Sequence, residues 1–315
     1  MTLLASGTEV VCALDCGDRL VARPHECDHP EWVKRLPAVT RARLDPSRPS
    51  SEIDRDVRGL LSNALSVYEV DHEQLDALEP DLLVTQVQCE VCAVSLRDVE
   101  AAVRTGLKSK PAIVSMQPDD LASLWTDMRA ISGALGVPER GVQLVTRLRA
   151  RMRGIAERAK GREVPRVACL EWIEPLMASG NWTPELIALA GAQDVLGEPG
   201  QHAGALAFER LIAADPDVIW ITPCGFDLAR TRAELDPLVT HPGWSELRAV
   251  REGHVFLGDG NALFNRPGPR VVEALECLAE AMHPEAYRFG HEGKGWERWR
   301  ETPAESRVEP RRKLG

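Results

Sequence analysis

Glu73-Gln-Leu-Asp-Ala-Leu-Glu-Pro-Asp-Leu-Leu83 resembles a second stretch, Glu209-Arg-Leu-Ile-Ala-Ala-Asp-Pro-Asp-Val-Ile219. The two stretches align without a gap, residue 73 with residue 209 and so on to the end. Each copy begins as a short amphipathic helix, which we expect to end at the residue before proline because the proline ring disfavours helix there. An apolar, β-rich run follows the Pro-Asp pair, as is typical of a buried parallel strand. The repeat therefore predicts two similar α/β lobes; the alternative is a common helix–strand junction that occurs twice by chance.

The rest of the chain alternates short apolar runs with helical patterns, which indicates parallel sheets. The fold class predicted is α/β, with two similar lobes of mostly parallel sheet joined by one long helix and a ligand cleft between them. The strands expected are 2–4, 20–22, 82–85 and 112–115 in the first lobe, and 166–170, 218–222 and 254–257 in the second.

Two helical patterns separate the lobes. The first runs over 119–135, with its N-cap at Asp119 or Asp120. The second runs over 139–161 and would extend about 34 Å, long enough for a stiff spine. We therefore divide the chain into an N-terminal lobe (1–117), a helical connector (118–162), a C-terminal lobe (163–289) and a polar tail (290–315) that is weakly ordered or docked only by its tryptophans.

Composition limits the function. The 315 residues carry a net charge of −10, which argues against nucleic-acid binding because that needs a basic face. No apolar run is long enough to span a bilayer. The first residues lack a basic segment, so the sequence predicts no signal peptide and a cytoplasmic location, or a periplasmic one if the start codon is misassigned.

Several further motifs occur in a characteristic order: Ser6-Gly-Thr-Glu9, Gly17-Asp-Arg-Leu-Val-Ala22, Cys27-Asp-His-Pro30, Ala178-Ser-Gly180, Glu185-Leu-Ile-Ala-Leu-Ala-Gly-Ala192 and Phe264-Asn-Arg-Pro-Gly-Pro-Arg270. With the repeat and the long helix, they resemble the cobalamin and iron-siderophore class of ABC-transporter solute-binding proteins, and most of all its cobalamin-binding type. The resemblance covers about residues 1–288.

The resemblance implies that a ligand, cobalamin or a related corrinoid or metal chelate, lies between the lobes. It also implies that one exposed glutamate on each lobe docks onto arginines of an ABC permease, and Glu73 and Glu209 occupy those positions. A simpler reading is that both are first-turn glutamates favoured by the helix dipole. The chain departs from the pattern at Leu263, where the cobalamin-binding type has a tryptophan, and in its cysteine-rich loops.

Ligands of parallel α/β lobes gather outside the carboxyl ends of the strands. The residues that follow the predicted strands are therefore candidates for the cleft. Trp172 and Phe264 could place a ring against a flat ligand, and Arg266 could meet a carboxylate or phosphate. The full set is His25, Cys27, Gln86, Cys89, Cys92, Glu171, Trp172, Cys224, Phe264 and Arg266.

Four of these residues are thiols: Cys27, Cys89, Cys92 and Cys224. Four thiolates suit zinc or an iron–sulfur cluster, and His25 or His29 could complete a mixed site. Cys89 and Cys92 could instead form a redox dithiol, or all four could merely pack as small apolar side chains.

Enzyme motifs are missing: the sequence has no Gly-x-Gly-x-x-Gly after a strand, no phosphate loop, no His-Glu-x-x-His and no Gly-x-Ser-x-Gly. The sequence therefore predicts a non-catalytic binding protein for a corrinoid or metal chelate. The alternative is a cytosolic metalloprotein that binds zinc or an iron–sulfur cluster through the cleft cysteines and could be redox-active.

Overall fold

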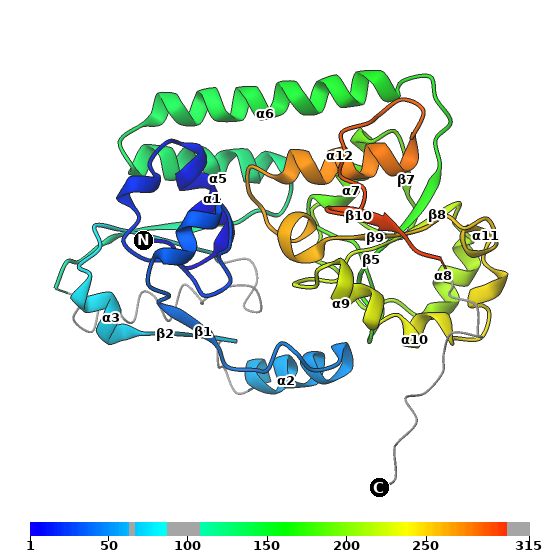
Figure 1. Ribbon diagram of the computed structural model, residues 1–315, viewed down its shortest axis with the longest axis horizontal. Coiled ribbons are helices and arrows are strands. Elements are labelled where there is room, and N and C mark those ends of the chain that lie inside the picture. The colour runs from blue at the N-terminus through cyan, green and yellow to red at the C-terminus, as the bar shows by residue number, and fades with distance from the viewer. Residues whose placement is uncertain (63–66, 87–107, 301–315) are drawn as a thin grey trace, which may run out of the picture.

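The computed structural model describes residues 1–62, 67–86 and 108–300. They form two α/β lobes joined along one edge by two helices, α5 (Leu121–Ala134) and α6 (Pro138–Ala159) (Figure 1). The predicted two-lobed α/β class is confirmed. Two predicted site residues, Cys89 and Cys92, lie outside the described residues.

The N-terminal lobe contains two small sheets. β1 (Thr40–Ala42) pairs antiparallel with β2 (Tyr68–Val70), and β3 (Leu82–Gln86) pairs parallel with β4 (Ala112–Met116). The lobe's described helical elements are α1 (Ala5–Ala13), η1 (Gly17–Arg19), η2 (Glu31–Arg35), α2 (Ser50–Ser62) and α3 (His72–Ala77).

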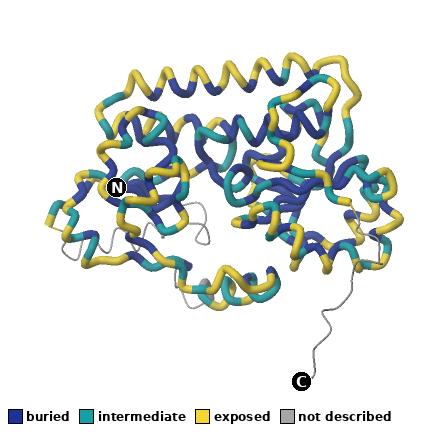
Figure 2. The backbone as a smooth tube through the Cα atoms, in the orientation of Figure 1, coloured by how far each residue is buried: buried dark blue, intermediate teal, exposed yellow. Residues whose placement is uncertain are grey.

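The C-terminal lobe is built on a six-stranded sheet whose central strands are buried (Figure 2). β8 (Val218–Ile221) lies parallel between β5 (Arg166–Trp172) and β9 (Val255–Gly258). The edges are β6 (Met177–Ala178), β7 (Gln193–Asp194) and β10 (Trp296–Arg298). The helical elements are α7 (Thr183–Leu189), α8 (Phe208–Ala214), α9 (Leu228–Ala233), α10 (Asp236–Val239), η3 (Trp244–Glu246), α11 (Arg248–Arg251), η4 (Gly260–Phe264) and α12 (Val271–Met282).

The sequence repeat is also a structural repeat. α3 leads into the parallel strand β3, and α8 leads into the parallel strand β8. The residue before each proline has a positive φ, 41° at Glu79 and 35° at Asp215. The expectation that each helix continues to that residue was wrong: α3 ends at Ala77 and α8 at Ala214. The chain makes the same left-handed corner in both lobes.

Two predicted strands also differ. Residues 2–4 form only one isolated parallel bridge, from Thr2 to Val84, and residues 20–22 form no strand. Instead, Arg23 forms a single bridge with Ala38. Leu20 and Ala22 are buried, so packing rather than a hydrogen-bonded ladder accounts for their apolar character.

α6 is the predicted spine. Its buried residues recur on one face, at Leu144, Val145, Leu148, Met152 and Ile155, while the opposite face is exposed (Figure 2). That face packs into an apolar cluster that contains residues of α1, α5 and α12. α5 begins at the predicted cap, Asp120, whose carboxylate accepts a 2.7 Å hydrogen bond from Ser123 N. The two lobes and the connector thus share one continuous core.

Part of the tail packs on the second lobe, because β10 pairs antiparallel with β9. Trp296 is buried, and its Nε1 donates to Glu280 at 3.0 Å. None of the helices in the described ranges combines the length and the apolar character that a bilayer crossing requires.

Candidate functional site

The wall contributed by the C-terminal lobe is aromatic. Trp172, at the end of β5, lies 5.3 Å from Phe226 between ring centroids, and Phe226 follows β8. The Arg230 guanidinium, on α9, lies over the Phe226 ring, 4.7 Å from its centroid. Trp172, Phe226 and Arg230 therefore follow neighbouring parallel strands, as the strand-end rule predicts.

Glu171 lies behind this wall. It is buried, and its carboxylate accepts hydrogen bonds from Gly180 N, at 3.4 Å, and from the Thr183 hydroxyl. Burial raises the pKa of Glu171 to about 7, and these hydrogen bonds only partly oppose that rise. The carbonyl oxygen of Glu171 accepts from Cys224 N at 3.1 Å, which ties together the ends of β5 and β8.

The wall contributed by the N-terminal lobe is centred on His25. Its Nδ1 lies 2.7 Å from Thr40 Oγ1, and its ring lies 5.2 Å from the Tyr68 ring. Tyr68 donates its hydroxyl to Glu26 at 2.5 Å. Burial lowers the pKa of His25 despite the opposing charge of Glu26, so the neutral imidazole is favoured. His25 Nε2 lies 4.0 Å from Glu26 Oε1, beyond hydrogen-bond distance.

Arg266 connects the two lobes. From the second lobe its guanidinium reaches the first, where it donates to Asp28 at 2.5 Å and to the Glu26 carbonyl at 3.3 Å. Glu9 of α1 accepts from Arg266 at 3.4 Å and from Arg270 at 2.5 Å. Burial alone would lower the pKa of Arg266, but Asp28 and Glu9 outweigh it and raise that pKa.

The interaction between Arg266 and Asp28 changes the pKa of Asp28 in the opposite direction. Burial alone would raise the pKa of Asp28, but the hydrogen bonds and charge of Arg266, with the charge of Arg270, lower it. Both partners are therefore held in their charged forms. The predicted role of Arg266 as a ligand contact remains a prediction, and its guanidinium is occupied by protein acceptors in this conformation.

A circuit of contacts runs from one lobe to the other and back. Phe226 O accepts from Asn261 N, and the Asn261 side chain accepts from Arg266. Arg266 reaches Glu26, next to His25, which bonds Thr40 of β1. The chain after β1 returns to the second lobe, where Ser47 O accepts from Arg230 at 2.9 Å. We call this circuit the lobe-bridging ring.

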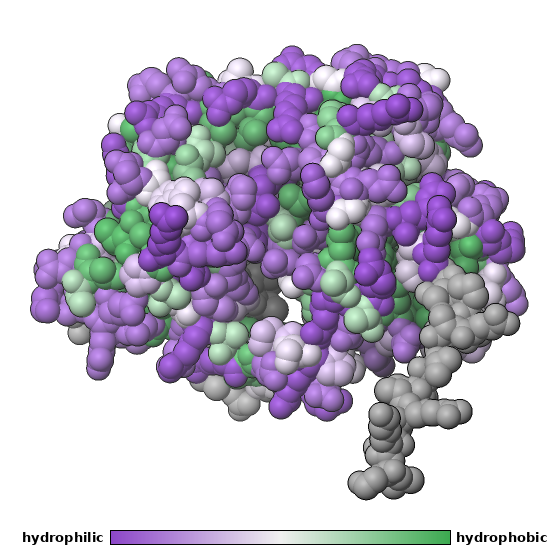
Figure 3. Space-filling model, viewed as in Figure 1, coloured by the Kyte–Doolittle hydropathy of each residue, from purple (hydrophilic) through white to green (hydrophobic). Residues whose placement is uncertain are grey.

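The ring joins the two lobes at two places, through Arg266 and through Arg230. On the side of the molecule away from α6, the molecular surface between the lobes is hollowed above α2 (Figures 1 and 3). The aromatic wall of Trp172 and Phe226 belongs to one side of the ring, and His25 and Tyr68 belong to the other. We take this hollow as the candidate ligand cleft.

The other predicted residues are placed differently. Phe264 is 1% exposed and packs against Trp220, with centroids 5.1 Å apart and the rings tilted by 53°, so its ring belongs to the core. Gln86 is buried at the end of β3. Cys27 is buried, and its Sγ lies 3.9 Å from His29 O, while Cys224 is partly exposed beside β5.

Burial raises the pKa of the Cys27 thiol, which opposes thiolate formation and outweighs the lowering by Thr8 and His29 hydrogen bonds. Across residues 1–62, 67–86 and 108–300, no group of three or more His, Cys, Asp or Glu side chains is arranged to hold a metal ion. The four-cysteine site stays a prediction, since two of its members lie outside these ranges.

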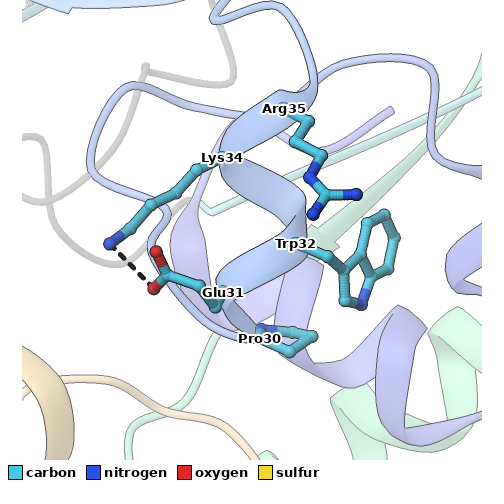
Figure 4. Close-up of a pocket in the computed structure, with 5 residues that line it drawn as sticks. All are labelled: Pro30, Glu31, Trp32, Lys34 and Arg35. Carbon is cyan, nitrogen blue, oxygen red and sulfur yellow. Dashed lines mark ion pairs between the residues drawn. The ribbon is translucent and has the colours of Figure 1, made fainter.

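A separate pocket lies on η2, with a volume of about 600 Å³ (Figure 4). Trp32 and Arg35 point to one side of this helix, and Glu31 and Lys34 form a 3.0 Å ion pair on the other. Trp32 is 39% exposed. None of the lining residues belongs to the lobe-bridging ring.

Sequence reasoning missed Tyr68, Phe226, Asn261 and Arg230. Phe226 follows Cys224 and Gly225 after a predicted strand, so the strand-end rule could have found it if extended by two residues. Tyr68 lies in β2, a three-residue strand without an apolar run, and no sequence signal marks it.

Comparisons with known proteins point to one group. A family model described as "Periplasmic binding protein" matches residues 2–262. An ABC transporter substrate-binding lipoprotein of Bacillus subtilis (strain 168) is 22% identical over 296 residues, covering 91% of this chain and 81% of the relative. A vitamin B12-binding protein of Vibrio vulnificus is 21% identical over 284 residues, covering 89% and 88%.

Solved structures show the same fold. A periplasmic heme-binding protein from Pseudomonas aeruginosa matches with a TM-score of 0.68 and 23% identity, over 90% of this chain and 92% of that one. The periplasmic vitamin B12-binding protein of Vibrio cholerae matches with a TM-score of 0.63 and 20% identity, over 89% and 94%.

Proposed function

Because the chain belongs to the periplasmic binding protein family, we propose that it is a non-catalytic binding protein that holds cobalamin or a related corrinoid between its lobes. Relatives in the family include proteins named for vitamin B12 and for heme, both large, metal-centred macrocycles. The expected partners are therefore this ligand and, for an exported protein, an ABC permease.

The observation that carries the proposal is the pair of unlike walls in the lobe-bridging ring. Trp172 and Phe226 supply apolar ring surface, which suits the face or edge of a macrocycle. In the other lobe, His25 has its Nδ1 held by Thr40, and burial favours its neutral form. A neutral imidazole with one nitrogen fixed is the arrangement in which the other nitrogen can coordinate a metal.

The test is titration with aquocobalamin and, separately, with hemin, followed by absorption and calorimetry. We expect saturable binding of aquocobalamin at one site per chain, with a spectral shift that His25→Ala removes. Trp172→Ala should weaken binding about tenfold, since an aromatic contact contributes roughly 0.5–1.5 kcal/mol beyond its buried area. Trp32→Ala, in the η2 pocket, is the matched control and should leave the affinity unchanged.

Two outcomes would contradict the proposal. Saturable binding of hemin alone would move the ligand to another tetrapyrrole, and binding of neither compound would reject the macrocycle. Metal and sulfide analysis of anaerobically purified protein tests the metalloprotein alternative, because bound zinc or iron–sulfide in stoichiometric amounts would favour it.

Docking to a permease forms a second part of the proposal, through Glu73 and Glu209. Both are exposed in the first turns of α3 and α8, at opposite ends of the long axis of the molecule (Figure 1). Exposed carboxylates at two such points can pair with two arginine clusters on one flat surface. Cell fractionation tests the expected cytoplasmic location: recovery in the periplasm would allow docking, and recovery in the cytoplasm would favour a carrier or sensor.

A further inference from the structure

The ring closes through a short contact between α9 and the segment before α2. Arg230 donates from Nη1 to Ser47 O at 2.9 Å and from Nη2 to Arg48 O. Ser50 N donates to Glu234 Oε2 at 3.1 Å. Three hydrogen bonds, each with a charged partner, therefore join the lobes at this point, and such bonds are stronger than neutral ones.

Both sides of the contact are held in place before they meet. Arg230 of α9 and Glu234, the residue directly after this helix, form an ion pair of 3.0 Å. On the other side, Asp45 Oδ1 accepts from Ser47 N at 2.9 Å and from Ser47 Oγ at 2.6 Å. This turn orients the carbonyl oxygens that Arg230 binds, so little ordering is needed when the contact forms.

Part of the contact is shielded from water. Ser50 is 1% exposed, although it lies at the start of a surface helix, and the Glu234 side chain is 16% exposed. The hydrogen bond between them is therefore less screened than a typical surface ion pair, whereas Arg230 meets Ser47 and Arg48 at an exposed site.

Arg230 contacts the aromatic wall as well as residues 47 and 48; we call this second contact, with that of Glu234, the mouth of the cleft. Its guanidinium lies over the Phe226 ring, and Phe226 contacts Trp172. A change at the aromatic wall therefore acts directly on the group that binds Ser47 and Arg48. In the molecule, α2 lies across the cleft from α6, beneath the hollow between the lobes (Figures 1 and 3).

We propose that Arg230 and Glu234, with the backbone of residues 47–50, form a latch that closes the mouth of the cleft and sets the rate of ligand exchange. The latch is closed without ligand, so a ligand has to break it both to enter and to leave. The effect of the latch on ligand exchange rests on the proposed function, whereas the closure of the mouth does not depend on it.

The first test is stopped-flow binding of aquocobalamin to the full chain. Glu234→Gln, which lies outside the aromatic wall, should raise the association and dissociation rates about tenfold, while the equilibrium constant changes less than about twofold. Arg230→Gln should raise both rates at least as much. The tenfold figure corresponds to loss of one charge-assisted hydrogen bond. Arg232→Gln is the matched control: it lies on the same helix, pairs with Glu297 of its own lobe, and should leave both rates unchanged.

The latch is rejected if both variants exchange ligand at the wild-type rate. It is also rejected if Arg230→Gln weakens binding only through faster dissociation, because that result would make Arg230 a direct ligand contact. Arg230→Lys should have an intermediate effect. The lysine ammonium keeps the charge but cannot donate to both carbonyl groups in the geometry of the planar guanidinium, so the rates should fall between those of wild type and Arg230→Gln.

The second test needs no ligand and separates the two proposals. Amide hydrogen exchange of the peptide covering residues 46–52 should speed up about tenfold in both variants. Glu234→Gln replaces the charged acceptor of Ser50 N–H, and Arg230→Gln removes the side chain that holds Glu234 and binds the carbonyl groups of Ser47 and Arg48. Arg232→Gln should match wild type. If wild-type protein binds no aquocobalamin, the proposed function fails while this measurement still decides the latch; unchanged exchange in both variants overturns it.

Discussion

Glu9 shows how one buried charge can join two lobes. Its side chain is 2% exposed on α1, and both of its partners, Arg266 and Arg270, come from the other lobe. Removing one member of a buried charged network leaves the remaining charges desolvated and unpaired. The network therefore matters most for holding the lobes in register.

Glu9→Gln should lower the free energy of unfolding by about 3–5 kcal/mol, the range for breaking a buried ion pair. Urea unfolding followed by circular dichroism measures it. Glu69→Gln is the control, because Glu69 pairs with Arg41 on the surface and its loss should leave the midpoint unchanged. Equal midpoints for the two variants would show that the network contributes no stability.

Glu171 predicts a pH dependence of stability. Burial raises its pKa from 4.5 to about 7, so between these values the folded protein keeps a proton that the unfolded chain releases. Stability contributed by the neutral acid is thus fully present below pH 4.5 and is lost as the pH rises toward 7. The loss amounts to about 3 kcal/mol at most.

Glu171→Gln should flatten this decline, because the amide stays neutral at every pH. Urea midpoints from pH 4.5 to 8, compared with those of wild type, give the difference. Asp127, whose pKa burial raises to about 6, contributes its own slope to both proteins and cancels in the comparison. A Glu171→Gln curve parallel to wild type would mean that Glu171 is charged in the fold.

At the scale of the element, β10 is a strand that its local sequence does not predict. It has three residues, and it exists because Trp296 fills space beside Trp220 and Phe256 and pairs with β9. Trp296→Ala should cost about 3–5 kcal/mol of unfolding free energy, the range for a buried aromatic. Trp32→Ala, at an exposed indole, should cost far less in the same calorimetric or urea measurement.

Long elements could be predicted from sequence and short ones could not. β3, β5, β8 and β9 carry continuous apolar runs, and α5 and α6 carry a cap and a helical period, so local signals sufficed. β1, β2 and β7 have two or three residues each, and their pairing is set by partners distant in sequence. β6 has two residues and pairs with the nearby end of β5. The strand predicted at residues 20–22 was wrong because an apolar run can be buried without forming the hydrogen bonds of a β-sheet.

The site divides in the same way. His25 and Trp172 were predicted from local cues, strands expected at 20–22 and 166–170, and only the second of these strands is present. Arg266 was predicted from a motif, but its acceptors were not, since Glu9 lies 257 residues away. The contact between Arg230 and Ser47 joins residues 183 apart, and only the fold brings them together.

At the scale of the whole molecule, the exposed glutamates of α3 and α8 predict a loss of coupling without a loss of binding. The double variant Glu73→Lys/Glu209→Lys should keep the wild-type affinity for aquocobalamin and the wild-type unfolding midpoint. It should no longer bind the cognate ABC permease in nanodiscs, because like charges would face the permease arginines. The neutral pair Ala77→Gln/Ala213→Gln, later in the same helices, is the control.

Permease binding by the charge-reversed variant at the wild-type level would reject the docking assignment. A shifted unfolding midpoint would point instead to a structural role at the two helix starts.

The described chain passes from one lobe to the other once, through α5 and α6 at a single edge. Any separation of the lobes is therefore a rotation about an axis near that edge, and displacement grows with distance from the axis. Packing beside α6 hardly changes during such a rotation, while the residues around α2, which are furthest from the axis, are displaced most. Departure of a bound molecule is thereby confined to one direction, away from the connecting helices and past the residues around α2.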